Sequence, residues 1–173
     1  MMEFNIFVRD ELPEDLVKIR KVNTEAFDTE TEARLVDRLR KTGIHLISLV
    51  AEVHGKVVGH ILFSPVTVEG NKLTPAIAAL APMAVLPEWQ NKGVGSRLVE
   101  IGLKKCKDYG YEAVVVLGFP EYYSRFGFVP SIKYGIESEY EVPPGIFMIQ
   151  ELEENSLKGV SGTLKYHQTF KEL

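Results

Sequence analysis

Cysteine is almost absent from this chain, and its scarcity excludes a fold held by disulfide bonds. Cys106 is the only cysteine among 173 residues, so no disulfide can form within the chain. The first residues, MMEFNIFVRD, contain neither a basic segment nor a long apolar run, and so they do not resemble a secretion signal. We therefore expect a cytoplasmic protein.

Long hydrophobic runs and an excess of positive charge are also missing. The longest apolar run, Ala76 to Leu86, is too short to cross a bilayer and contains Pro82. It is typical of a protein core. The formal net charge of -4 gives no general attraction for nucleic acid, which requires clustered Lys and Arg. We expect neither a membrane nor a nucleic-acid partner, which leaves small molecules or other proteins.

The length and composition favour one domain that spans residues 1–173. Hydrophobic residues make up 45% of the chain and charged residues 25%, which is enough to bury one core. The sequence contains no internal repeat, low-complexity tract or linker between domains.

Apolar periodicity and turn signals predict a mixed α/β sheet with one crossover at its centre. In the first half, the expected elements are a strand at 4–9, helices at 13–27 and about 29–41, a hairpin that turns at His54-Gly55, and a strand that ends at Leu86. In the second half, we expect a helix from Val94 to Gly110, with one face formed by Val94, Leu98, Ile101, Gly102, Lys105 and Tyr109. A buried strand in EAVVVLGF, a short element in PEYYSRFGF and late strands in GIFMIQEL and GTLKYHQTF follow it.

The stretch PEWQNKGVGSRLVE, residues 87–100, lies between an apolar run and the start of a predicted helix. Glycine allows the backbone to approach a ligand without a side chain in between. The start of a helix carries free N–H groups and the positive end of the helix dipole. This combination favours a phosphate ligand. The alternative is a tight strand-to-helix turn that binds nothing.

Two common phosphate-binding patterns do not fit this stretch. A P-loop requires four residues between its glycines and a following Lys-Ser or Lys-Thr, whereas Lys92 precedes Gly93 and one residue separates the glycines. A dinucleotide-binding loop requires a third Gly or Ala where Leu98 stands, and an acidic residue after the next strand, whereas Glu112 precedes it.

The segment AVLPEWQNKGVGSRLVE resembles motif A of the GNAT superfamily of acyl-CoA N-acyltransferases, with Gln90, Gly93 and Gly95 at the fixed places. The segment YYSRFGF resembles the Tyr-x-x-x-Gly-Phe signature of the same superfamily, with Tyr123 as its tyrosine. The resemblance extends from Phe4 to about Ile136. Within the superfamily, the sequence resembles a branch of predicted bacterial N-acetyltransferases. It is weak over the C-terminal strands at about 137–173.

This resemblance implies a largely antiparallel central sheet with a splayed parallel strand pair and flanking helices. Acetyl-CoA is the implied cosubstrate, with its pyrophosphate on backbone N–H groups of the glycine loop and its pantetheine arm along the strand that precedes the loop. An N–H of Ala84 or Val85 is the implied partner of the thioester oxygen. The implied cofactor-binding residues are Met83, Ala84, Val85, Gln90, Asn91, Lys92, Gly93, Val94, Gly95 and Ser96.

The implied reaction is direct attack of a primary amine on the thioester, with Tyr123 as the general acid and Tyr122 as the alternative. Glu25, Glu32 and Glu121 are candidate bases, and none has a spacing that singles it out. The four histidines lack the spacing of metal ligands, so we expect no metal site. We expect Cys106 and His60 to be packed residues.

The acceptor amine stays unidentified at this stage, and a homodimer is suggested by analogy alone. Two groups of acids in the last part of the chain are suited to attracting a cationic acceptor, but exposed loop charge explains them equally well, so they do not identify a substrate. They are Glu137, Glu139 and Glu141, before VPPG, and Glu151, Glu153 and Glu154, after the next strand. The second hypothesis for function is a non-catalytic module that binds or senses acyl-CoA. The third is a structural domain whose glycine turn has no ligand.

Overall fold

The computed structural model describes residues 4–143 and 145–172. The chain forms two compact units. The first consists of Met1–Phe63, Ala81–Gly102 and Thr169–Leu173, and the second of Ser64–Leu80 and Leu103–Gln168. Each unit is described by itself below. No helix within the described residues is both long and apolar enough to cross a membrane.

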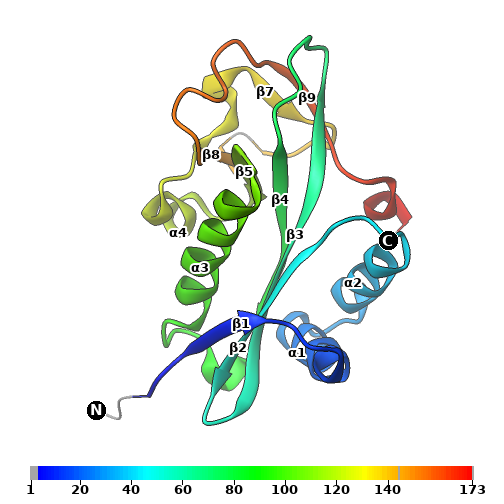
Figure 1. Ribbon diagram of the computed structural model, residues 1–173, viewed down its shortest axis with the longest axis vertical. Coiled ribbons are helices and arrows are strands. Elements are labelled where there is room, and N and C mark those ends of the chain that lie inside the picture. Colours follow the sequence, from blue (N-terminus) through cyan, green and yellow to red (C-terminus); the bar gives the residue numbers. More distant parts are fainter. Residues whose placement is uncertain (1–3, 144, 173) are drawn as a thin grey trace. The chain divides into compact units, whose positions relative to one another are not determined.

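Three antiparallel strands organise the first unit. Strand β1 (Phe7–Asp10) pairs with β2 (Ile47–Val53), and β2 pairs with β3 (Lys56–Glu69) over Lys56–Phe63. Both residues of the turn between β2 and β3, His54 and Gly55, have positive φ angles. This left-handed pair is typical of the tight hairpin turn that the sequence predicted. Figure 1 shows β2 and β3 as one long hairpin.

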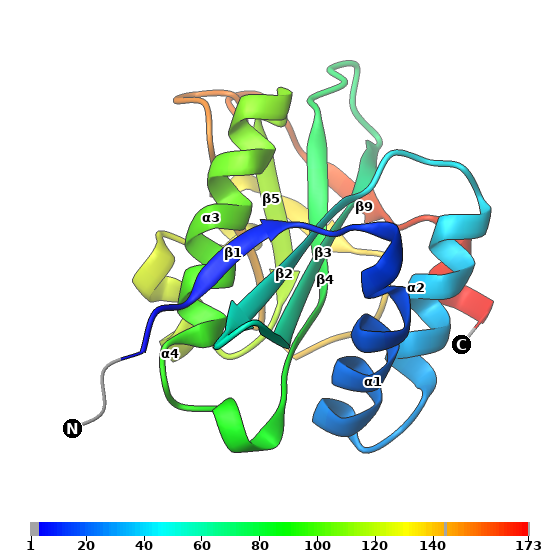
Figure 2. The same ribbon diagram turned by 60° about the horizontal axis from the view of Figure 1, so that its bottom comes forward.

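Two helices complete the hydrophobic core of the first unit. A short 3-10 turn at Pro13–Asp15 leads into α1 (Leu16–Phe27), and α2 (Thr31–Lys41) lies beside it (Figures 1 and 2). Both helices were predicted from the sequence. The C-terminal 3-10 helix (Gln168–Glu172) is attached to α2, because Arg38 Nη1 donates a 2.6 Å hydrogen bond to the carbonyl oxygen of Glu172.

A buried ion pair joins β1 to the start of the helical region. Arg9 donates two hydrogen bonds to Asp15, at 2.7 and 3.1 Å, and a third to Glu52 on β2 at 2.9 Å. The backbone N–H of Leu12 donates to the same Asp15 carboxylate at 2.7 Å. The hydrogen bonds from Arg9 hold the pKa of Asp15 below its usual value. Because the buried Asp15 carboxylate accepts three hydrogen bonds from this segment, it fixes the chain direction between strand and helix.

The second unit contains the parallel strand pair that the sequence predicted. Strand β4 (Ile77–Val85) pairs in parallel with β5 (Ala113–Leu117), with Ile77–Ala79 opposite Ala113–Val115. Strand β5 then pairs antiparallel with β8 (Phe147–Glu151), and β8 pairs antiparallel with β6 (Val129–Pro130). The fold is therefore the predicted mixed α/β class with a mostly antiparallel sheet. The splay of the parallel pair stays a prediction.

The remaining strands of the second unit form a pairing that the sequence did not predict. Strand β7 (Ile136–Ser138) pairs in parallel with β9 (Gly162–Lys165), which lies beside it in Figure 1. Strand β9 also pairs antiparallel with the end of β3, at Thr67–Glu69. The predicted late strand in GIFMIQEL is β8. In GTLKYHQTF only Gly162–Lys165 forms a strand, and its last residues belong to the 3-10 helix Gln168–Glu172. Strand β7 was not predicted.

Helix α3 (Val94–Tyr109) buries part of the predicted face, including Val94 and Leu98. Its buried side chains are Val94, Leu98, Val99, Leu103 and Cys106. Tyr109, which was placed on the apolar stripe, is 56% exposed. Burial raises the pKa of the Cys106 thiol to about 12. Cys106 is therefore a neutral core residue, as expected.

His60 on β3 is fully buried and held by two side chains. Asn23 Nδ2 lies 3.1 Å from His60 Nδ1, and Ser48 Oγ lies 2.8 Å from His60 Nε2. Burial, and to a smaller extent the positive charge of Arg40, lowers the pKa of His60 to about 3. A neutral, enclosed imidazole agrees with the expectation that His60 is packed.

We expect His60 to make the folded state less stable as the pH falls. The unfolded chain takes up a proton near the ordinary histidine pKa of 6.5, whereas the folded chain does so only near 3. Lowering the pH from about 7 to about 5 should therefore reduce the free energy of unfolding by about 2 kcal/mol through this residue. Urea unfolding at several pH values measures the slope, which His60→Gln should reduce. His54→Gln, in the exposed hairpin turn, is the control and should retain the slope. Equal wild-type stability at both pH values would contradict the assignment.

Candidate active site

The last residues of β4, just before the glycine loop, alternate between half-buried and buried. Ala84 is buried, whereas Met83 and Val85 are half-buried. The backbone N–H of Leu86 donates to the carbonyl oxygen of Val58 at 2.9 Å, which fixes the end of the strand to β3. Gln90 Nε2 donates a 3.0 Å hydrogen bond back to the carbonyl oxygen of Val85. The glycine loop is therefore tied directly to the strand that precedes it.

Trp89 anchors the first turn of the loop. It belongs to a 3-10 turn, Pro87–Trp89, and its ring contacts Phe4 edge to face at a centroid distance of 5.2 Å. The ammonium of Lys92 lies 5.2 Å from the centroid of the Trp89 ring and donates a 3.0 Å hydrogen bond to the carbonyl oxygen of Glu88. Lys92 is thus held against the turn by a cation–π contact and a hydrogen bond.

Gly93 adopts a left-handed conformation immediately before α3. Its φ angle is 88°, and Asn91 two residues earlier also has a positive φ. The first helical hydrogen bond runs from the N–H of Arg97 to the carbonyl oxygen of Gly93 at 3.1 Å. The N–H groups of the next three residues, Val94 to Ser96, therefore have no acceptor within the helix. They lie at the positive end of the helix dipole, where an anion is stabilised.

The ten residues predicted to bind a cofactor all belong to the first unit. Asn91, Lys92 and Gly93 are exposed, and the side chain of Val94 is buried. A backbone nest that is open to solvent and anchored by a buried side chain is suited to binding a phosphate. Tyr123, the predicted general acid, belongs to the second unit.

Tyr123 is a buried tyrosine at the end of the short helix α4 (Pro120–Tyr123). Its ring contacts Tyr122 and Phe128 edge to face, at centroid distances of 5.0 and 5.6 Å. Burial, and to a smaller extent Tyr122, raises the pKa of Tyr123 to about 12. The phenol is therefore protonated at neutral pH and can act as a hydrogen-bond or proton donor.

Gly118 provides the surface against which the Tyr123 ring packs. An ideal Cβ built on Gly118 would lie 2.2 and 2.6 Å from two ring carbons of Tyr123, distances that no real side chain allows. The N–H of Gly118 donates to the carbonyl oxygen of Ile146 at 3.0 Å, which fixes its position. This role was not predicted from the sequence. The available signal was a glycine that directly follows a buried strand, which indicates a close approach.

Tyr122 and the candidate bases have distinct surroundings. The guanidinium of Arg125 lies 4.6 Å from the Tyr122 ring centroid, and Phe126 contacts the same ring. Glu25 lies 3.8 Å from the ammonium of Lys21. Oε2 of Glu32 is buried and has no hydrogen-bond partner among the described residues. This last environment distinguishes Glu32 from the other candidate bases.

Comparison with known proteins identifies the family. The model of the acetyltransferase (GNAT) family matches residues 10–128, which is more than half of the chain. The chain belongs to the acetyltransferase (GNAT) family. Among curated proteins, it is 35% identical to the uncharacterized N-acetyltransferase YhbS of Escherichia coli K12 over 166 residues, covering 95% of this chain and 98% of YhbS. It is 41% identical to YjhQ of the same organism over 132 residues, covering 75% of this chain and 73% of YjhQ.

Solved GNAT structures share the fold. A crystal structure of YhbS from E. coli in complex with CoA has a TM-score of 0.91 at 33% identity and covers 99% of this chain and 94% of its own. A GNAT acetyltransferase from Brucella melitensis in complex with acetyl-CoA has a TM-score of 0.78 at 32% identity and covers 96% of this chain and 98% of its own. These findings confirm the predicted GNAT-type acyltransferase and its fold class. The single-domain assignment and the residue roles stay predictions.

We expect Gly118→Ala to displace the Tyr123 ring and to lower the pKa of Tyr123 from about 12 toward its ordinary value of 10. The added methyl group occupies the space of the ring edge, so the ring must move toward solvent. NMR titration of ring-labelled tyrosines measures this pKa, and the spectrum of Tyr123→Phe assigns the resonance. An unchanged Tyr123 pKa, with its contact to Phe128 retained, would show that Gly118 does not position the ring.

Proposed function

We propose that this GNAT protein transfers the acetyl group of acetyl-CoA to a primary amine. The observation that carries the proposal is the row of N–H groups from Val94 to Ser96, which have no acceptor within the helix and follow the left-handed Gly93. Relatives of known structure with more than 30% identity were solved with CoA or acetyl-CoA. A diphosphate satisfies such amides.

In this proposal, the backbone of the glycine loop from Asn91 to Ser96 binds the pyrophosphate, and Met83 to Val85 bind the pantetheine amides. The N–H of Ala84 or Val85 stabilises the negative charge that develops on the thioester oxygen. Gln90 contributes indirectly, since its hydrogen bond to the carbonyl oxygen of Val85 joins the two binding segments. Phosphate binding and thioester alignment are therefore coupled.

The amine nitrogen attacks the thioester carbonyl, the new carbon–nitrogen bond forms, and the carbon–sulfur bond breaks. Tyr123 donates a hydrogen bond, and finally its proton, to the departing sulfur. A phenol with a pKa of about 12 stays protonated until the sulfur becomes negative, so its contribution is greatest as the bond breaks. The attacking amine loses its proton to a base, and the buried, unpartnered Oε2 favours Glu32 for this role. The cytoplasmic location and the homodimer stay predictions.

Gly93→Val should weaken CoA binding by more than about tenfold, because a β-branched residue strongly resists the left-handed conformation. An ideal Cβ at Gly93 meets only Ile6 Cδ1, at 3.9 Å, so the effect comes from the backbone and not from a clash. Gly43→Val is the matched control, since Gly43 has a φ of 76° and open space around it. Calorimetry with CoA measures both affinities. Wild-type affinity in a folded Gly93→Val protein would exclude this loop as the pyrophosphate site.

Tyr123→Phe should reduce turnover by about 100-fold or more while leaving acetyl-CoA affinity unchanged, because it removes a proton donor and keeps the packed ring. Tyr122→Phe is the control and should retain most activity. Thiol release from acetyl-CoA with a panel of amines measures turnover. Saturable acetyl-CoA binding without transfer to any amine would favour the non-catalytic binding module. Unchanged turnover in Tyr123→Phe would remove Tyr123 from the mechanism.

A further inference from the structure

Helix α3 and strand β3 meet at two glycines of the first unit. An ideal Cβ built on Gly59 of β3 would lie 2.9 Å from Cγ1 of Val94 and 3.0 Å from Cδ1 of Leu98. An ideal Cβ built on Gly102 of α3 would lie 2.6 Å from two ring carbons of Phe63 on β3. Real Cβ atoms essentially never come closer than 3.0 Å to a neighbour. The absence of these two side chains therefore sets the distance between helix and strand.

The contact at Gly59 lies beneath the first turn of α3. Val94 is the first residue of this helix and directly follows Gly93. Val94 and Leu98 are 1% and 0% exposed, so both side chains are enclosed where they meet β3. The N–H groups from Val94 to Ser96, which have no acceptor within the helix, belong to the same turn. The position of these N–H groups above the sheet therefore depends on Gly59.

The neighbouring residue of β3 fixes the other end of the glycine loop. The pairing of β2 with β3 shifts register at this point, since Ala51 lies opposite Gly59 and the next residue of β2 lies opposite Val57. Val58 is thus an extra residue on β3, a β-bulge, which is a feature over-represented beside active sites. Its carbonyl oxygen accepts the 2.9 Å hydrogen bond from the N–H of Leu86. Two consecutive residues of β3 therefore hold the strand before the loop and the helix after it.

We infer that Gly59 is a positioning residue for the cofactor site, because the absence of its side chain sets the depth at which the N–H groups at the start of α3 lie. The inference rests on the proposed function. Val94 makes the contact sensitive, since a β-branched side chain in a helix has one strongly preferred χ1 rotamer. It cannot turn away from an added methyl group, so the backbone of the first turn must move. The N–H groups that are proposed to bind the diphosphate move with it.

Gly59→Ala should weaken CoA binding about tenfold, because the displaced N–H groups lose the equivalent of one hydrogen bond to a charged group. Calorimetry with CoA measures the Kd. The matched control is Gly102→Ala, whose Cβ meets the Phe63 ring at the shorter distance of 2.6 Å. This contact lies about two turns farther along the same helix. The control should lower the urea midpoint of unfolding at least as much as Gly59→Ala, but change the Kd less than about twofold. Equal weakening of CoA binding by both variants would overturn the inference.

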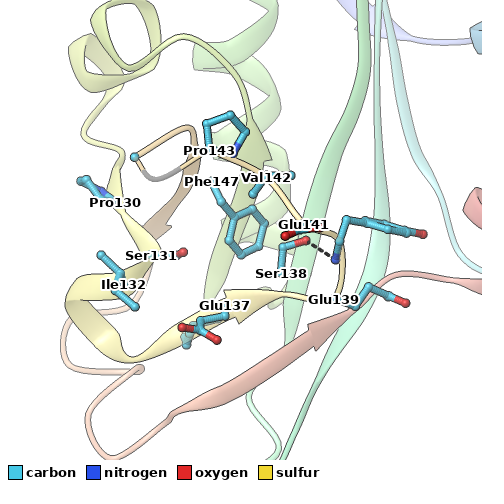
Figure 3. Close-up of a pocket in the computed structure, with 13 residues that line it drawn as sticks. Pro130, Ser131, Ile132, Glu137, Ser138, Glu139, Glu141, Val142, Pro143 and Phe147 are labelled. Atoms are coloured by element: carbon cyan, nitrogen blue, oxygen red, sulfur yellow. Dashed lines mark hydrogen bonds between the residues drawn. The ribbon is translucent and has the colours of Figure 1, made fainter.

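A cavity in the second unit offers a control for the added carbon atom itself. Its volume is about 500 Å³, and Figure 3 shows Val142 and Phe147 among the side chains that line it. Val142→Ile also adds one carbon atom, but beside open space, whereas Gly59 is buried against Val94. This variant should retain both the Kd for CoA and the urea midpoint. Weaker CoA binding by Val142→Ile would show that the affinity responds to any added carbon, which would overturn the role of Gly59.

The double variant Gly59→Ala/Val94→Ala tests the contact and covers the case in which Gly59→Ala does not fold. Val94→Ala removes the Cγ1 atom that the new Cβ would meet. Compared with Val94→Ala alone, the double variant should therefore change the Kd for CoA less than about twofold, because residues in contact have coupled effects. A further loss of about tenfold in the double variant would show that the contact with Val94 is not the cause, and this result would overturn the inference.

Titration of the wild-type protein with CoA separates this inference from the proposed function. If the wild-type protein does not bind CoA, the proposed function fails, and the role of Gly59 toward the cofactor fails with it. If the wild-type protein binds CoA and the folded Gly59→Ala protein binds it equally well, the inference alone is overturned and the proposed function stands.

Discussion

The left-handed turn at Gly93 is the constraint on which the candidate cofactor site depends. It allows α3 to begin directly after an exposed loop, so that three N–H groups have no helical acceptor. Two anchors preserve this geometry: Val94 is buried, and Trp89 is packed against Phe4. Because Gln90 also bonds to Val85, a shift of the loop would be transmitted to the strand proposed to align the thioester. A change in the loop that binds the anion would therefore also change the proposed position of the acyl group.

Tyr123, the proposed acid, illustrates how burial keeps a side chain protonated. The apolar surroundings that raise its pKa to about 12 make it a poor donor in bulk water, but they keep it protonated. Such a donor is suited to stabilising the negative charge on a leaving sulfur as the carbon–sulfur bond breaks. It is not suited to protonating the thioester before that step. Its position depends on the absence of a side chain at Gly118, so the residue after a strand positions the proposed acid five residues away.

Local signals in the sequence predicted most helices, strands and turns, but they did not predict contacts between segments far apart in the chain. The hairpin at His54-Gly55 and the helix after Gly93 follow from turn chemistry. The apolar face of α3 was misjudged at Tyr109, because one polar position in the stripe was accepted and Val99 was overlooked. The parallel pairing of β7 with β9 joins segments far apart in the chain. The packing of the Tyr123 ring on Gly118 likewise leaves no periodic pattern in the sequence.

Cofactor binding and acceptor selection use different parts of the chemistry of this chain. Backbone N–H groups bind a diphosphate in any sequence that keeps the turn, so the glycine motif identifies the family and says nothing about the amine. Recognition of an amine requires side chains, and these must come from parts of the chain other than the glycine motif. Two members with the same glycine loop can therefore use different amines.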